Sequence, residues 1–160
     1  MQRGDGIVEL GCGIGLNFPL LMKGIGPEGR VIGVDLSPEM LSCVQEQVAG
    51  AGWHNVKLVR TDMPDYEFPS GVNKVLSTNA LGYLTDYERL IERALRALAS
   101  GGRVVILDGK WSQGCLLWLV RLFVWLMSPF VVTFEYFDTH SWNSIARYFQ
   151  EPAVEDVCGA

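Results

Sequence analysis

The stretch VELGCGIGLN, residues 8–17, decides how the rest of the chain is interpreted. It begins with a short apolar run that is typical of a buried strand, and glycines follow at every second position, Gly11, Gly13 and Gly15. Because glycine adopts backbone conformations that other residues avoid, this spacing indicates a tight loop between a strand and a helix. In open parallel sheets, ligands bind beside such loops, beyond the carboxyl ends of the strands.

The spacing of the glycines distinguishes two classes of ligand. The dinucleotide pattern G-x-G-x-x-G needs a small residue at position 16, where this chain has Leu16. Glu9 also precedes the loop, and a carboxylate is a poor neighbour for a pyrophosphate. A ligand with positive charge, such as an α-amino group or a sulfonium, suits the loop better. A nicotinamide-dependent oxidoreductase is therefore a disfavoured alternative.

Strand-like and helical segments alternate along the chain, which predicts an α/β fold with a doubly wound, Rossmann-like, mostly parallel sheet. Five strands are expected, at residues 6–11, 30–35, 56–62, 72–77 and 103–109. Helices are expected near residues 17–23, after Ser37, and from a capping box of Thr85 and Glu88 to the pair Gly101 and Gly102. No linker or repeat interrupts the 160 residues, so we expect a single domain.

Two of the predicted helices have a clear apolar face. The first follows a Ser37 cap with Pro38 at its first position, which is the preferred place for proline. Its apolar residues recur at steps of three and four: Met40, Leu41, Val44 and Val48. The buried face expected for the later helix consists of Leu90, Ile91, Ala94, Leu95 and Leu98.

Composition excludes several classes of function. The net charge of −5 argues against nucleic acid as a partner, because phosphate contacts need clustered Lys and Arg. The four cysteines are widely spaced, which is typical of reduced thiols in a cytoplasmic protein. His54 and His140 lack partners at ligand spacing, so no metal site is expected. The polar N-terminal MQRGDG does not resemble a signal peptide.

The apolar segment 116–132, LLWLVRLFVWLMSPFVV, is interrupted by Arg121 and by Ser128 and Pro129. It is therefore a poor candidate for a helix that spans a membrane, which needs about 20 uninterrupted apolar residues. Three interpretations stay open: a buried helix, a cover over a hydrophobic substrate, or peripheral contact with a membrane. Aromatic residues are frequent in the wider region 111–150, which favours a cover over a hydrophobic substrate as much as a buried helix.

Taken together, the motifs resemble those of class I S-adenosylmethionine-dependent methyltransferases. VELGCGIG and VIGVDLSPEML are similar to the first two motifs of that family, and LVRTDMPDYEFP is similar to its acidic adenine-contact region. The resemblance continues through VLSTNALGYLTDYERLIERALRALASGGRVVILD and covers residues 5–109. Within the family, these motif sequences are most similar to those of the branch that methylates quinone precursors and phospholipids.

The resemblance implies that S-adenosyl-L-methionine is the cofactor. The residues expected around its methionine part are Glu9, Gly11, Cys12, Gly13, Gly15 and Asn17. Cys12 has the alternative interpretation of a small packed side chain, and it is not expected to be a nucleophile.

By the same resemblance, Asp35 accepts hydrogen bonds from the ribose hydroxyls, and Leu36 and Met40 pack on the adenine. Asp62 and the backbone of Met63 contact the polar edge of the adenine. Either aspartate alone would more often be a solvated acid at the end of a strand. Their occurrence with the glycine loop makes the cofactor interpretation more specific.

Asn79, Ala80 and Leu81 are expected beside the sulfonium and the methyl group, although Asn79 could equally satisfy its own loop backbone. The implied reaction is methyl transfer to a small acceptor, hydrophobic or lipid-like, under a substrate cap at 111–150. Tyr83, Tyr136 and His140 are candidate bases, and nothing in the spacing selects among them.

Three features depart from the family. Asn73 stands where an acidic residue is common, and the helix that usually precedes the first strand is missing. The chain also stops at VEDVCGA, where the last, antiparallel strand pair would begin. A chain shortened at both ends is therefore expected, and a non-catalytic module that binds the cofactor or a partner is the alternative function.

Overall fold

Within the described part of the chain, five strands form one sheet in which every neighbouring pair runs parallel. The computed structural model describes residues 1–81, 84 and 87–107, which belong to the compact unit Met1–Leu107. The strands are β1 (Gly6–Leu10), β2 (Arg30–Asp35), β3 (Val56–Arg60), β4 (Val72–Thr78) and β5 (Leu98–Leu107). The predicted Rossmann-like α/β fold is confirmed.

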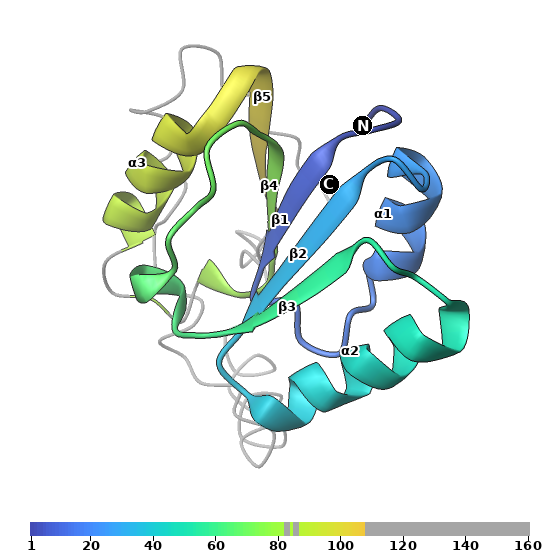
Figure 1. Cartoon of the computed structure of the whole chain (residues 1–160). Helices are drawn as coiled ribbons and strands as arrows, with labels where there is room; N and C mark the ends of the chain where they lie inside the picture. The colour runs from blue at the N-terminus through green and yellow to red at the C-terminus, as the bar shows by residue number, and fades with distance from the viewer. Residues whose placement is uncertain (82–83, 85–86, 108–160) are drawn as a thin grey trace, which may run out of the picture. The chain divides into compact units, whose positions relative to one another are not determined.

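The order of the strands across the sheet is β3-β2-β1-β4-β5. The chain moves outward from β1 to β3 and then crosses to the other side of β1, where β4 and β5 follow (Figure 1). The order therefore reverses between β1 and β4. In open parallel sheets, ligands bind beyond the carboxyl ends of the strands at such a switch point.

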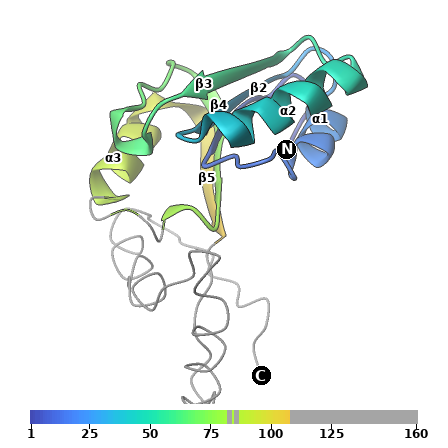
Figure 2. The same ribbon diagram turned by 90° about the horizontal axis from the view of Figure 1, so that it is seen from below.

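Helices cover both faces of the sheet. The helices α1 (Phe18–Ile25) and α2 (Pro38–Ala51) lie on one face, and α3 (Tyr87–Ala97) lies on the other (Figure 1 and Figure 2). The first layer is filled by apolar side chains that include Ile7, Phe18, Ile25, Val31 and Val44. The second layer includes Val8, Leu10, Val34, Val75 and Leu90. Adjacent residues of β1 thus enter opposite layers, as the alternation of a strand requires.

The start of α2 agrees with the prediction in all but one residue. Ser37 caps the helix, because its side-chain oxygen accepts a hydrogen bond from the backbone N–H of Met40 at 3.2 Å. Leu41 and Val44 are buried, as predicted. The prediction was wrong for the burial of Met40, which lies at the margin of this apolar face and is 43% exposed.

The end of α3 differs from the prediction. The helix stops at Ala97, and Leu98 already belongs to β5, where it pairs with Val72. Beyond this pair the register between β4 and β5 shifts. Gly101 has a φ of 74°, a left-handed conformation that few other residues adopt. Gly101 and Gly102 therefore form an irregular start to β5 and do not terminate the helix.

Several predictions fall outside the described residues. They concern the Thr85 cap, the apolar segment 116–132, the substrate cap at 111–150 and the final antiparallel strands. The single-domain assignment for all 160 residues stays a prediction for the same reason. Among the helices of residues 1–81 and 87–107, none has the length and apolar character needed to cross a membrane.

Close packing at Gly33 of β2 provides a test of the first layer. A β-carbon at this position would lie 2.7 Å from Cζ of Phe18 and 3.0 Å from Sγ of Cys12. Since Phe18 is fully buried, Gly33→Ala is expected to lower the free energy of unfolding by about 1–3 kcal/mol, the usual cost of overpacking. Urea unfolding measures this change.

The control for that experiment is Gly50→Ala on α2, where a β-carbon meets no atom within 4 Å. This variant should be slightly more stable, by about 0.5–1 kcal/mol, because alanine favours the helix. Equal midpoints for the two variants would contradict the packing described for Gly33.

Candidate functional site

The loop after β1 turns sharply on three left-handed glycines. Gly11, Gly13 and Gly15 have φ values of 64°, 52° and 77°. A β-carbon on Gly11 would lie 2.3 Å from Cβ of Ala80, and one on Gly15 would lie 3.2 Å from the methyl groups of Val44. Gly13 has open space on that side. The loop is therefore held between the residues after β4 and helix α2, and its middle faces open space.

Asp35, the last residue of β2, ties this loop to the next helix. One carboxylate oxygen accepts a hydrogen bond from the backbone N–H of Gly13 at 2.8 Å. The other accepts from the backbone N–H of Ser37 at 2.9 Å. Each oxygen keeps a lone pair, so this carboxylate can still accept hydrogen bonds from a ligand.

Glu9 lies beneath the loop, and only 2% of the residue is exposed. Its Oε1 accepts a hydrogen bond from Nδ2 of Asn17 at 2.6 Å, and the same amide nitrogen lies 3.1 Å from Oγ1 of Thr78. No hydrogen-bond partner among the described residues reaches Oε2, which is also buried. Burial raises the pKa of Glu9 to about 7, although the hydrogen bond from Asn17 acts in the opposite direction.

Cys12 is a packed side chain at this loop. It is 6% exposed and belongs to the apolar layer under α1 and α2. Burial, and then the negative charges of Asp35 and Glu9, raise the pKa of the Cys12 thiol to about 12. A thiol that stays protonated is a poor nucleophile, which agrees with the expectation from the sequence.

The adenine-contact residues predicted from the sequence lie at the ends of β2 and β3. Leu36 is 60% exposed, so it is available to a ligand together with the exposed Met40. Asp62 is exposed at the start of the short helix η1 (Met63–Asp65). Met63 packs partly into the core, and its sulfur lies 3.7 Å from the position of a β-carbon on Gly11. The structure thus brings Met63 close to the glycine loop.

The residues after β4 reach the same edge of the sheet. Asn79 is exposed, has a φ of 52°, and donates its backbone N–H to the carbonyl of Leu107 at 2.8 Å. Ala80 and Leu81 are buried, and Ala80 stands against Gly11. This contact draws the end of β4 toward the loop after β1.

Sequence reasoning missed Thr78, which contacts Asn17 across the switch point. Its position at the end of β4 was the available signal. The departure at Asn73 has a structural explanation, because its Oδ1 accepts a hydrogen bond from the backbone N–H of Gly6 at 2.7 Å. That bond lies near the start of β1, away from the candidate site. Within the part of the chain that the structure describes, no group of three potential ligands could hold a metal ion.

Comparison with known proteins decides the family. A family model described as a methyltransferase domain matches residues 7–102, which is more than half of the chain. The chain belongs to this family. The predicted resemblance to class I S-adenosylmethionine-dependent methyltransferases is confirmed.

Similar proteins include enzymes with different names. Over 109 residues, or 68% of the chain, it is 34% identical to an arsenite methyltransferase of Halobacterium salinarum and 30% identical to a demethylmenaquinone methyltransferase of Listeria monocytogenes. These matches cover 28% and 46% of the two relatives, so this chain spans less than half of the length of either relative.

Among solved structures, phosphoethanolamine N-methyltransferase 2 of Haemonchus contortus, in complex with S-adenosyl-L-methionine, has a similar fold. The TM-score is 0.73 with 27% identity, and the match covers 92% of this chain and 33% of that one.

The raised pKa of Glu9 predicts how stability depends on pH. Below pH 4.5 the carboxyl is protonated in both the folded and the unfolded state, so burial costs little. Between pH 4.5 and about 7 it ionises first in the unfolded state, so the free energy of unfolding falls as the pH rises. Glu9→Gln should abolish this loss. Relative to the wild type, the variant should gain up to about 3 kcal/mol between pH 4.5 and 8.

Urea unfolding of both proteins across this range measures the difference. Glu46→Gln, which changes an exposed carboxyl on α2, is the control. A constant difference between the wild type and Glu9→Gln at all pH values would contradict the burial of an uncompensated carboxyl.

Proposed function

We propose that this chain binds S-adenosyl-L-methionine at the carboxyl ends of β1 to β4 and transfers its methyl group to a small acceptor that is hydrophobic or lipid-like. The observation that carries the proposal is the buried Oε2 of Glu9 beneath the glycine loop, which has no hydrogen-bond partner among the described residues. A buried carboxylate without a partner is costly, and a cationic group supplies what it lacks. Membership of the methyltransferase family supports this choice of ligand.

The methionine part of the cofactor fits the loop because it carries a cationic α-amino group. The ammonium donors would satisfy Glu9, and Gly13 offers open space beside the loop backbone. A pyrophosphate would instead be placed near this carboxylate. Leu16, at the position of the third small residue of a dinucleotide loop, is 77% exposed and adds a bulky side chain there.

The nucleoside part of the cofactor fits the ends of β2 and β3. Asp35 would accept hydrogen bonds from the ribose hydroxyls with the lone pairs that its two backbone partners leave free. Leu36 and Met40 are exposed apolar side chains at the same edge, where they would cover the adenine ring. Asp62 and the backbone of Met63 would contact the polar edge of the adenine.

The bound cofactor supplies a methyl group activated by its sulfonium. The chain contributes orientation: the glycine loop and Asp35 hold the donor, and the residues from Asn79 to Leu81 border the side from which an acceptor approaches. Tyr83, Tyr136 and His140 lie outside the described residues, so we assign no base.

The hydrophobic acceptor rests on the aromatic content of residues 111–150. The relatives named for a demethylmenaquinone and for phosphoethanolamine show that members of the family differ in acceptor. We propose for this chain an apolar acceptor, as the name of the first relative indicates. Transfer to a polar acceptor such as phosphoethanolamine would contradict the proposal.

Loss of the Asp35 carboxylate should weaken the nucleoside half of the site. Asp35→Ala is expected to reduce affinity for S-adenosylhomocysteine by about 1–3 kcal/mol, as for lost hydrogen bonds to a charged group. Calorimetric titration measures the loss, and Glu46→Ala on α2 is the matched control at an exposed acid. An unchanged affinity would remove Asp35 from the site, and tight binding of NAD in place of S-adenosylhomocysteine would remove the cofactor assignment.

Methyl transfer tests the activity. With cofactor labelled in its methyl group, label should appear in the apolar fraction of a quinone and lipid extract, and Asp35→Ala should reduce it in proportion to the lost affinity. Label found only in phosphoethanolamine would overturn the hydrophobic acceptor. Cofactor binding without transfer to any acceptor would favour a non-catalytic binding module.

A further inference from the structure

The segment that follows β3 runs beyond the sheet. The strand ends at Arg60, and the hydrogen bond from the N–H of Thr61 to the carbonyl of Asp35, at 3.1 Å, is the next link to β2. The chain then forms η1, where Pro64 has no N–H to donate. Carbonyl groups in such a segment need donors from elsewhere in the fold.

Arg93 of α3 supplies two of these donors. Its guanidinium nitrogens Nη1 and Nη2 donate to the backbone carbonyls of Pro64 and Tyr66. The two acceptors lie 29 and 27 residues away in sequence. Arg93 is half-buried, and its planar head joins two carbonyls of the segment.

The segment is also anchored by the buried side chain of Tyr66. Tyr66 is 6% exposed, and its ring meets that of Phe68 edge to face at a centroid distance of 4.9 Å. The N–H of Tyr66 donates to the carbonyl of Met63 at 3.2 Å. These contacts hold the C-terminal part of the segment. The guanidinium bond to the carbonyl of Pro64 lies between this anchor and Asp62, and the bond to the carbonyl of Tyr66 reinforces the anchor itself.

We propose that Arg93 is a positioning residue that fixes Asp62 and the Met63 backbone for recognition of the adenine base. This inference rests on the proposed function, because it assigns the adenine to the end of β3. Arg93 itself makes no contact with the ligand in this proposal. It acts through the carbonyls of Pro64 and Tyr66, and it thereby makes base recognition depend on the placement of α3.

Arginine is suited to this role because its planar head presents several N–H donors in a fixed geometry, and it can hold two carbonyls at once. Lysine would keep the charge but would present a single, mobile ammonium. Methionine would keep much of the packed stem and remove every donor. The two substitutions therefore separate charge from the paired hydrogen bonds.

The test compares two ligands that differ only at the base. S-inosylhomocysteine carries a carbonyl where S-adenosylhomocysteine carries the adenine amino group. In the proposed site, the carboxylate of Asp62 would accept a hydrogen bond from this amino group. The wild type should bind the adenine compound at least about tenfold more tightly, since the inosine carbonyl would face a carboxylate. In Arg93→Met this preference should fall by about fivefold, with Arg93→Lys in between.

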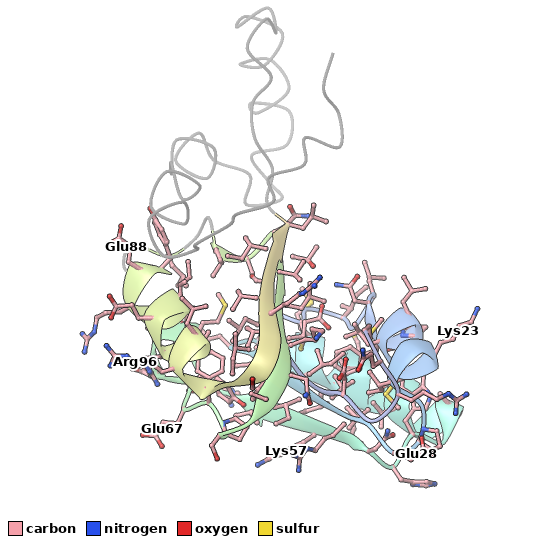
Figure 3. All side chains as sticks on the ribbon, turned by 90° about the horizontal axis from the view of Figure 1, so that it is seen from above. Lys23, Glu28, Lys57, Glu67, Glu88 and Arg96 are labelled. Atoms are coloured by element: carbon pink, nitrogen blue, oxygen red, sulfur yellow. The ribbon has the colours of Figure 1, made fainter. Side chains whose placement is uncertain are left out.

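The ratio of the two affinities distinguishes positioning from folding, because a smaller folded fraction weakens both ligands equally. Arg96→Met is the matched control on the same helix. The side chain of Arg96 is 80% exposed, it pairs with Glu92 at 3.6 Å, and it points away from the ribbon in Figure 3. This control should keep the wild-type ratio.

Each outcome has one meaning for the proposal. An unchanged ratio in Arg93→Met would overturn it, and if that variant does not fold, an unchanged ratio in Arg93→Lys would do so. A wild type that binds both ligands equally would also overturn it, while cofactor binding itself would stand. Failure of the wild type to bind either ligand would overturn the proposed function instead.

Discussion

The close approach of the loop after β1 to the end of β4 is the constraint on which the site depends. Gly11 lies so near Ala80 that a β-carbon would overlap the alanine side chain, and three left-handed glycines let the backbone follow this path. The loop is thereby fixed between β4 and α2. With the loop in place, the carboxylate of Asp35 meets the N–H of Gly13, and β1, β2 and β4 share one edge.

The same folding of the loop buries Glu9 and leaves one of its oxygens without a hydrogen-bond partner in the part of the chain that the structure describes. Asn17 donates to only one of the two carboxylate oxygens, so the buried Glu9 lowers the stability of the folded protein near neutral pH. Cores that retain such a group commonly do so at functional sites, where a ligand completes the hydrogen bonds. The buried acid and the open side of Gly13 are the two features on which the proposed cationic ligand rests.

Particular residues show how far the sequence could be interpreted. Local patterns were interpreted correctly: the glycine spacing, Asp35 at the end of β2 and the Ser37 cap. They predicted the loop, the doubly wound sheet and the start of α2. Met40 and Leu98 were assigned wrongly. Met40 sits at the margin of the apolar stripe, where burial depends on what the helix packs against. Leu98 fits a helical repeat, but pairing with Val72 outweighs that preference.

The sequence by itself indicated the parallel α/β fold, the glycine loop and the acids at the strand ends, because the patterns that predict them lie among residues that are neighbours along the chain. Only the tertiary structure decided that Oε2 of Glu9 meets no partner among residues 1–81, 84 and 87–107, that Asn17 lies against Thr78, and that Arg93 holds the segment after β3. These contacts join residues that are 27 to 61 positions apart, or depend on the whole surrounding core, and no local pattern encodes such distances.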